Sequence, residues 1–139
     1  GGRSFDNVLQ DSTVSRNFGG IIMGVSNNTF SNNHISLNLR HGIRLIATST
    51  YNTFNNNIVS DNNKLSTTST YSNISVESGA SYNIFTGNII ESHDAPLPHT
   101  GIYVTVPGAV GNQFTNTQFS GTYLTGRNFI DRGTGTIWK

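Results

Sequence analysis

The chain has 139 residues and a formal net charge of +1, and charged residues make up only 11% of it. This length fits one domain, and so small a net charge predicts no attraction to nucleic acid or to an anionic membrane. The absence of cysteine removes disulfides and thiolate chemistry, and no apolar run has the length of a membrane helix. We therefore expect a single domain over 1–139 with neither a nucleic-acid partner nor membrane insertion. Its start has no apolar signal region, and we expect a segment of a longer protein.

An eight-residue phrase recurs along the chain. Its pattern is Asn, any residue, Phe, any two residues, Asn (once Thr), any residue, and then a large apolar residue. Copies begin at Asn28, Asn52, Asn83 and Asn112, and a fainter one begins at Asn7. The intervals of 21, 24, 31 and 29 residues are typical of repeat arrays. The phrase therefore predicts a solenoid.

A second, shorter phrase lies between copies of the first and recurs once in each repeat. Short alternating runs at 35–39, 43–45, 74–76 and 102–106 predict strands, whereas no stretch holds the apolar period of a helix. Three short strands per repeat describe one coil of a parallel β-helix, with equivalent strands about 4.8 Å apart. We expect an all-β solenoid of about five coils over 7–120. The apolar anchors of the second phrase are Ile21, Ile43, Ile74, Ile102 and, less clearly, Phe129.

The Asn and Phe positions of the first phrase have structural roles in such a coil. Phe30 and Ile35 are five residues apart, so one unbroken strand cannot point both side chains inward. Asn32 and Asn33 supply a turn between them, because Asn tolerates the left-handed backbone conformation. We expect one aromatic column inside the solenoid and two ladders of side-chain amides between coils. The column is Phe30, Phe54, Phe85 and Phe114; the ladders are Asn33, Asn57 and Asn88, and Asn28, Asn52, Asn83 and Asn112.

These repeats resemble those of right-handed parallel β-helix proteins of the pectate-lyase-like superfamily. The Asn-x-Phe-x-x-Asn-x-Ile pattern is similar to repeats in periplasmic copper-processing proteins, mannuronan epimerases and phage tail spikes. The resemblance covers about residues 7–130. It implies a right-handed helix in which Asn32 and Asn33 occupy the tight turn. It also implies that the strand from Gly42 belongs to the sheet that lines the substrate groove in the enzymes.

Two repeats carry extra residues, at 61–71 and 91–100, and both sets fall between the first phrase and the second. Insertions in a solenoid gather as loops on one face, which is often the binding face. We expect these loops to overhang the strands at 42–46, 73–77 and 101–105. Strand alternation places Arg44, Ser75 and Tyr103 in one outward row, and Ile46, Glu77 and Thr105 in the next.

The surface predicted under the loops holds the best candidates for chemistry. A glycosidase needs two carboxyl groups that flank one bond, and Glu77 with Glu91 or Asp94 meets this only if the loop folds back. A lyase or epimerase needs a proton acceptor and, beside it, a group that neutralises the carboxylate of the substrate. The loop histidines are candidates for the first role and Arg44 for the second. The candidate catalytic residues are Glu77, His93, Asp94 and Arg44, and the candidate substrate-binding residues are Arg44, Ser75, Tyr103, Thr105 and His99.

Other chemistry has no support in the sequence. There is no acid cluster suited to calcium, no zinc-ligand spacing and no nucleophile motif, so we expect neither a metal nor a cofactor. His34 and His41 flank a strand end, where solvation is expected. The Gly- and Thr-rich tail, 121–139, is expected to cap the solenoid, with Trp138 over the last coil or against another subunit.

The sequence favours a structural and binding module over an enzyme. The expected function is carbohydrate contact by part of an extracellular or virion-surface protein of the phage tail-spike or appendage type. The alternatives are a polysaccharide lyase, hydrolase or C5-epimerase acting on an acidic glycan, and a periplasmic accessory protein. Open coil ends predict a homotrimer or attachment to further coils, and the expected partner is a polysaccharide or cell-surface glycan.

Overall fold

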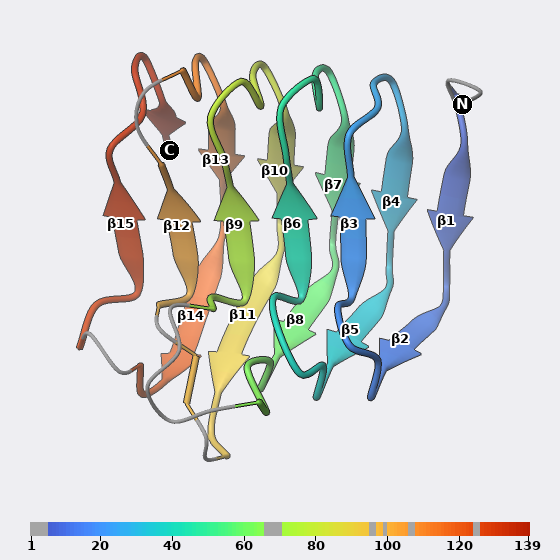
Figure 1. Cartoon of the computed structure of the whole chain (residues 1–139), viewed down its shortest axis with the longest axis vertical. Helices are drawn as coiled ribbons and strands as arrows, with labels where there is room; N and C mark the ends of the chain where they lie inside the picture. The colour runs from blue at the N-terminus through green and yellow to red at the C-terminus, as the bar shows by residue number, and fades with distance from the viewer. Residues whose placement is uncertain (1–5, 66–70, 95–96, 99, 106–107, 124–125) are drawn as a thin grey trace.

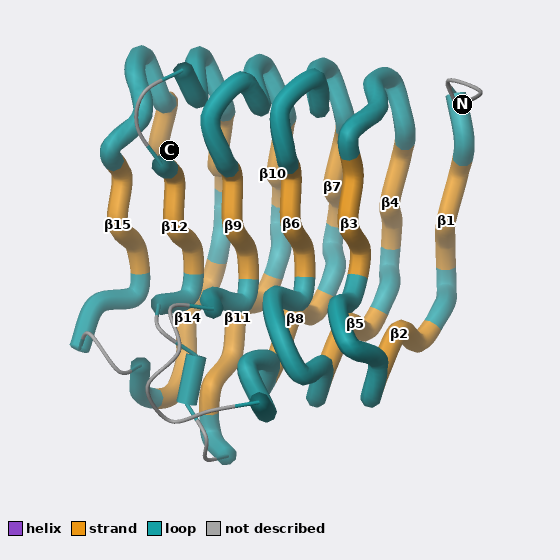
Figure 2. The backbone as a smooth tube through the Cα atoms, viewed as in Figure 1, coloured by secondary structure: helices purple, strands orange, loops and turns teal. Residues whose placement is uncertain are grey.

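The computed structural model describes residues 6–65, 71–94, 97–98, 100–105, 108–123 and 126–139. Within these ranges the regular elements are short β-strands, and parallel pairing assembles them into three sheets along one axis (Figure 1). In Figure 2 the described segments between the strands are loops and turns. The described part of the chain contains no helix that could span a membrane. The predicted all-β parallel solenoid is confirmed.

We name the sheets A, B and C in the order in which each coil visits them. Sheet A contains β1 (Val8–Gln10), β4 (Thr29–Ser31), β7 (Thr53–Asn55), β10 (Ile84–Thr86), β13 (Gln113–Thr115) and β16 (Ile137–Trp138). Sheet B contains β2 (Thr13–Ser15), β5 (His34–Ser36), β8 (Ile58–Ser60), β11 (Ile89–Ser92) and β14 (Gln118–Gly121). Sheet C contains β3 (Ile21–Met23), β6 (Ile43–Leu45), β9 (Ile74–Val76), β12 (Ile102–Val104) and β15 (Phe129–Asp131).

The corner between sheets A and B is the tight turn predicted from the first phrase. Only two residues separate β4 from β5, and the first of them, Asn32, has a φ of 55°. The same position has positive φ in the following coils, at Asn56, Gly87 and Asn116. Because Asn and Gly adopt this conformation at low cost, the phrase turns the chain sharply at the same point in each coil.

The predicted aromatic column fills the interior beside sheet A. Successive phenylalanine rings from Phe30 to Phe114 are stacked, with centroids 4.9, 4.6 and 4.7 Å apart. Trp138 follows Phe114 in register, and its ring centroid lies 4.5 Å from that of Phe129. The indole thus lies over the end of the column within the chain, with 45% of the residue exposed. The tail also supplies β15 and β16, which continue sheets C and A.

Both predicted amide ladders are present. Within a row, the side-chain oxygen of one Asn accepts two N–H groups from the Asn of the preceding coil. For example, Asn57 Oδ1 accepts from the backbone N–H of Asn33 and from Asn33 Nδ2, each at 3.0 Å. The rows are Asn7–Asn28–Asn52–Asn83–Asn112 and Asn33–Asn57–Asn88. A third row, Asn17–Asn38–Asn62–Asn73, lies at the corner between sheets B and C and was not predicted.

Two local expectations concern the connection from sheet B to sheet C. The strand expected over 35–39 stops at Ser36, because Leu37 has a φ of 56° and begins the next corner. The extra residues of the long repeats lie, as predicted, between sheets B and C. After β8 the chain turns back on the preceding coil, where the Asn63 N–H donates to the Arg40 carbonyl at 2.9 Å. Asn73 then returns in the amide row directly after Asn62.

Candidate functional site

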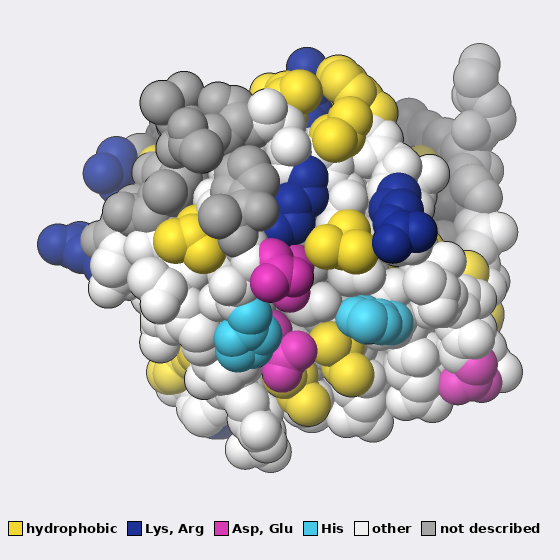
Figure 3. Space-filling model, turned by 90° about the horizontal axis from the view of Figure 1, so that it is seen from below, with side chains coloured by type: hydrophobic (Ala, Val, Ile, Leu, Met, Phe, Trp, Pro, Cys, Tyr) yellow, Lys and Arg dark blue, Asp and Glu magenta, His cyan; other side chains and the backbone are white. Residues whose placement is uncertain are grey.

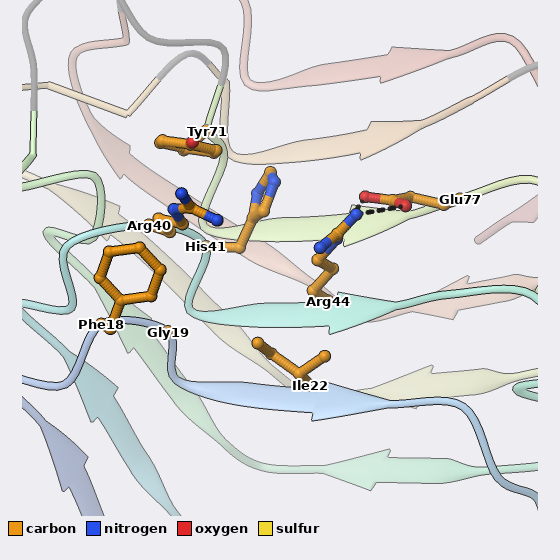
Figure 4. A pocket seen from close by; sticks show the side chains of 8 residues that line it. All are labelled: Phe18, Gly19, Ile22, Arg40, His41, Arg44, Tyr71 and Glu77. Atoms are coloured by element: carbon orange, nitrogen blue, oxygen red, sulfur yellow. Dashed lines mark hydrogen bonds and ion pairs between the residues drawn. The ribbon is translucent and has the colours of Figure 1, made fainter.

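A pocket of about 330 Å³ lies on sheet C where the chain enters it from sheet B (Figure 4). Several of its residues share one place in the repeat: Phe18, Arg40 and Tyr71 each stand three residues before an apolar anchor of the second phrase. Since Ile21, Ile43 and Ile74 are in register, these three side chains come from equivalent points on neighbouring coils. The lining residues are Phe18, Gly19, Ile22, Arg40, His41, Arg44, Tyr71 and Glu77.

The Arg40 guanidinium lies between two aromatic rings. Its central carbon is 4.0 Å from the Phe18 ring centroid and 5.3 Å from that of Tyr71. This stacking favours a cation electrostatically, because the ring faces carry partial negative charge. The Nε atom is buried and has no hydrogen-bond partner. The aromatic rings therefore hold Arg40 in place without satisfying its N–H donors.

His41 stands beside this stack and also reaches the next coil. The Ser72 N–H donates to His41 Nδ1 at 3.0 Å, and the imidazole meets the Tyr71 ring edge-on with centroids 5.1 Å apart. Burial lowers the pKa of His41 to about 4, although the Ser72 carbonyl acts in the opposite direction. The ring is therefore neutral at pH 7. His41 is partly buried, so the expectation of a solvated side chain was wrong for it, whereas His34 is exposed.

Arg44 and Glu77 form a two-point ion pair at the other side of the pocket. Arg44 Nε donates to Glu77 Oε1 at 2.6 Å, and Arg44 Nη2 donates to Oε2 at 3.0 Å. This hydrogen bond to Glu77 raises the pKa of Arg44 above its usual value. The sequence placed both residues on the outer surface of the sheet, and the structure joins them to each other. Glu77 is the single carboxylate of the pocket lining, so two carboxyl groups do not face one bond there.

The other sheet C candidates occupy the predicted rows. Ser75 pairs with Arg44 on one side and Tyr103 on the other, in register. Its side chain is buried, because its neighbours cover it. Tyr103 is partly exposed and lies 5.9 Å from the Arg132 guanidinium, and Thr105 follows β12 and is partly exposed. None of these three lines the pocket.

His93 and Asp94 lie on another face of the molecule. Their backbone N–H groups donate to Asp61 Oδ1 at 2.7 and 2.8 Å, and His93 Nε2 is 3.4 Å from the hydroxyl of Ser120, which belongs to sheet B. Figure 3 shows acidic and histidine side chains close together on the molecule seen from below Figure 1. The candidate residues are thus divided between two faces. His99 lies outside the described residues.

Residues before the second phrase were the ones that sequence reasoning missed. Phe18, Arg40 and Tyr71 were not singled out, and His41 was given no role in a site, although aligning the second phrase by its apolar anchors puts Phe18, Arg40 and Tyr71 in one column. That alignment was the available signal. In the described ranges, no group of three or more His, Cys, Asp or Glu side chains could hold a metal ion.

The comparison with known families agrees with this architecture. A family model described as a right-handed β-helix region matches residues 2–119. Comparison with curated proteins and with solved structures gives no match. The family match covers most of the chain, and the parallel coils and amide ladders are those predicted from the repeats. The chain therefore belongs to the right-handed β-helix family.

Proposed function

We propose that the sheet C pocket contacts carbohydrate, and that the chain is a structural and binding module of an extracellular or virion-surface protein. The tail-spike or appendage type is the model that we favour. The observation that carries the proposal is the pocket lining, in which aromatic rings stand beside an ordered polar pair. Sugars present apolar C–H faces and a rim of hydroxyls, so this combination suits both of their surfaces.

The polar residues of the pocket are arranged to form hydrogen bonds with a ligand, and they lack the arrangement that hydrolysis needs. Arg44 and Glu77 fix each other in one plane, and their remaining donor and acceptor sites can meet hydroxyl groups. A glycosidase of the usual kind would need a second carboxylate, which the lining lacks. Binding therefore accounts for more of the geometry than cleavage does.

Exposed aromatic residues allow a matched test of this proposal. Phe18 lines the pocket and is 57% exposed, whereas Tyr51 is 60% exposed, lies outside the lining and stacks on Tyr82. We expect Phe18→Ala to weaken binding of a captured oligosaccharide by about tenfold, and Tyr51→Ala to leave it within about twofold. Glycan-array capture followed by calorimetry measures both. Equal loss in the two variants, or no captured glycan at all, would contradict the proposal.

A lyase or epimerase remains the second candidate, because His41 is neutral and lies in the lining with Arg44. A pKa of about 4 makes it a weak proton acceptor, which counts against rapid catalysis. Incubation with polysaccharides distinguishes enzyme from binder: unsaturated sugar ends reveal a lyase, and an inverted configuration at C5 reveals an epimerase. Product formation that is abolished in His41→Asn would replace the binding proposal by the enzymatic one.

The proposed assembly has a separate test. Sedimentation equilibrium measures the mass in solution, and a trimer of the 15.1 kDa chain supports the spike type. A monomer removes that type and leaves the pocket proposal standing, because all of the pocket residues come from one chain.

A further inference from the structure

We propose that Arg40 is the anion-binding residue of the pocket, and that the pocket takes a sugar unit carrying an oxyanion, either a carboxylate or a sulfate. This inference rests on the proposed carbohydrate function and adds the chemical class of the ligand. It also transfers the recognition of charge from Arg44, which the sequence favoured, to a residue that the sequence analysis did not consider.

The two pocket arginines differ in their hydrogen bonds to the protein. Arg44 donates from Nε to Glu77 Oε1 at 2.6 Å and from Nη2 to Glu77 Oε2 at 3.0 Å. Arg40 has no acceptor for its guanidinium within the described residues, and its Nε is buried without a partner. Pairing leaves Arg44 and Glu77 neutral as a unit. The net charge of the pocket is therefore the single positive charge of Arg40.

The aromatic rings of the pocket flank Arg40. The Phe18 and Tyr71 ring centroids lie 4.0 and 5.3 Å from the central carbon of its guanidinium (Figure 4). Among the described residues the terminal NH₂ groups have no hydrogen-bond partner, and, unlike Nε, they are not among the buried unpaired atoms. They form a planar pair of donors, which is the arrangement that binds two oxygens of one oxyanion.

Energetics favour an anion over a neutral hydroxyl. A partly buried cation with unsatisfied donors carries a desolvation cost, which a charged acceptor offsets more fully than a neutral one. His41 adds no competing positive charge at neutral pH, because its burial keeps the imidazole uncharged. A pocket of about 330 Å³ has room for a sugar ring that carries such a group.

The test compares charged oligosaccharides with neutral partners of the same size. The probes are a hexuronate oligosaccharide with its methyl ester, and a sulfated oligosaccharide with its desulfated form. We expect at least one charged form to bind the wild-type chain about tenfold to a hundredfold more tightly than its neutral partner. Arg40→Gln should abolish that preference. Arg40→Lys should lose most of it, because an ammonium keeps the charge without the planar pair of donors.

A matched variant controls for general loss of positive charge. Arg16 is exposed and lies outside the pocket lining, so Arg16→Gln should retain the preference for the charged form. If Arg40→Gln does not fold, Arg40→Lys and the wild-type pairs decide the question. The Arg40 Nε–H group gives a direct readout, since burial slows its exchange with water: its nuclear magnetic resonance signal should shift with the charged probe and not with the neutral one.

The outcomes separate this inference from the function on which it rests. Equal binding of charged and neutral probes overturns the anion proposal and leaves carbohydrate binding intact. A preference that survives Arg40→Gln also overturns it, because the anion must then be recognised elsewhere. If neither the glycan array nor the charged and neutral probes show any binding, both proposals are removed.

Discussion

The corner between sheets A and B and the corner between sheets B and C are built on opposite plans. At the first, two residues turn the chain, and an Asp, Asn or Gly with positive φ stands at the same position from one coil to the next. At the second, the length of the connection varies from coil to coil, as the segments 37–42, 61–73 and 93–101 show. Regular spacing gives each side chain an equivalent partner one coil away. At the irregular corner, equivalent points on neighbouring coils carry different side chains, and three of these, Phe18, Arg40 and Tyr71, line the pocket.

The largest expected effect comes from breaking the regular corner. Asn57 is fully buried; its Oδ1 accepts two N–H groups from Asn33, and its Nδ2 donates to Phe30 and Asn88. Asn57→Ala leaves several of these buried groups unsatisfied, so we expect it to lower the free energy of unfolding by about 3 kcal/mol. Urea denaturation measures this, with the neighbouring exposed Asn56→Gly as the control, expected to cost less than about 0.5 kcal/mol. Similar losses in both variants would show that ladder position does not decide stability.

A pH titration of stability probes the irregular corner. The pKa of His41 is about 4 in the folded chain, below the ordinary value of 6.5, so the unfolded chain binds more protons between these values. Stability should therefore fall as the pH drops below about 6.5, by about 2 kcal/mol at pH 5, and His41 should add no further loss below about pH 4.

His41→Asn should flatten this part of the pH profile, since it removes the titrating ring and keeps a side-chain acceptor for Ser72. His34→Gln, at an exposed histidine of sheet B, should keep the slope. Thermal denaturation at a series of pH values gives the comparison. A slope that persists in His41→Asn would assign it to other groups.

The smallest expected effect is at the ion pair of the pocket. Glu77→Gln removes the charge from a pair whose side chains are 37% and 27% exposed, for Arg44 and Glu77. Solvent screening makes such pairs weak, so the free energy of unfolding should change by less than about 1 kcal/mol. Chemical denaturation measures the change. A loss comparable to that of Asn57→Ala would mean that the pocket, too, is a stabilising part of the coil.

The repeats predicted the fold because each coil imposes the same physical demands on the same positions. Phe54 must stack on Phe30 and Phe85, and Asn57 must bond to Asn33 and Asn88, so spacing alone reveals their partners. The third amide row lies outside the first phrase, and its last step, from Asn62 to Asn73, spans only 11 residues, a separation that matches no coil length. The chain there turns back on its own previous coil before it continues.

The candidate site was predicted less completely than the fold. Alternation on the strands correctly placed Arg44 and Glu77 on the outer surface, but it could not show that the two would bind each other. The position of His93 depends on how its loop folds, and contacts with Asp61 direct it to sheet B. Arg40 and Tyr71 precede strands and belong to no alternating pattern. Only their shared offset from Ile43 and Ile74 indicated that they would meet.

The direction of the amide ladders also determines how the molecule should respond to force. The covalent chain runs around the solenoid, whereas the Asn–Asn bonds and the strand pairing run along it, and the N- and C-terminal coils lie at opposite ends of the stack (Figure 1). Tension between the two ends therefore loads one coil boundary at a time. A single-molecule pulling experiment should therefore show the chain unfolding from its ends in successive steps of about one repeat each.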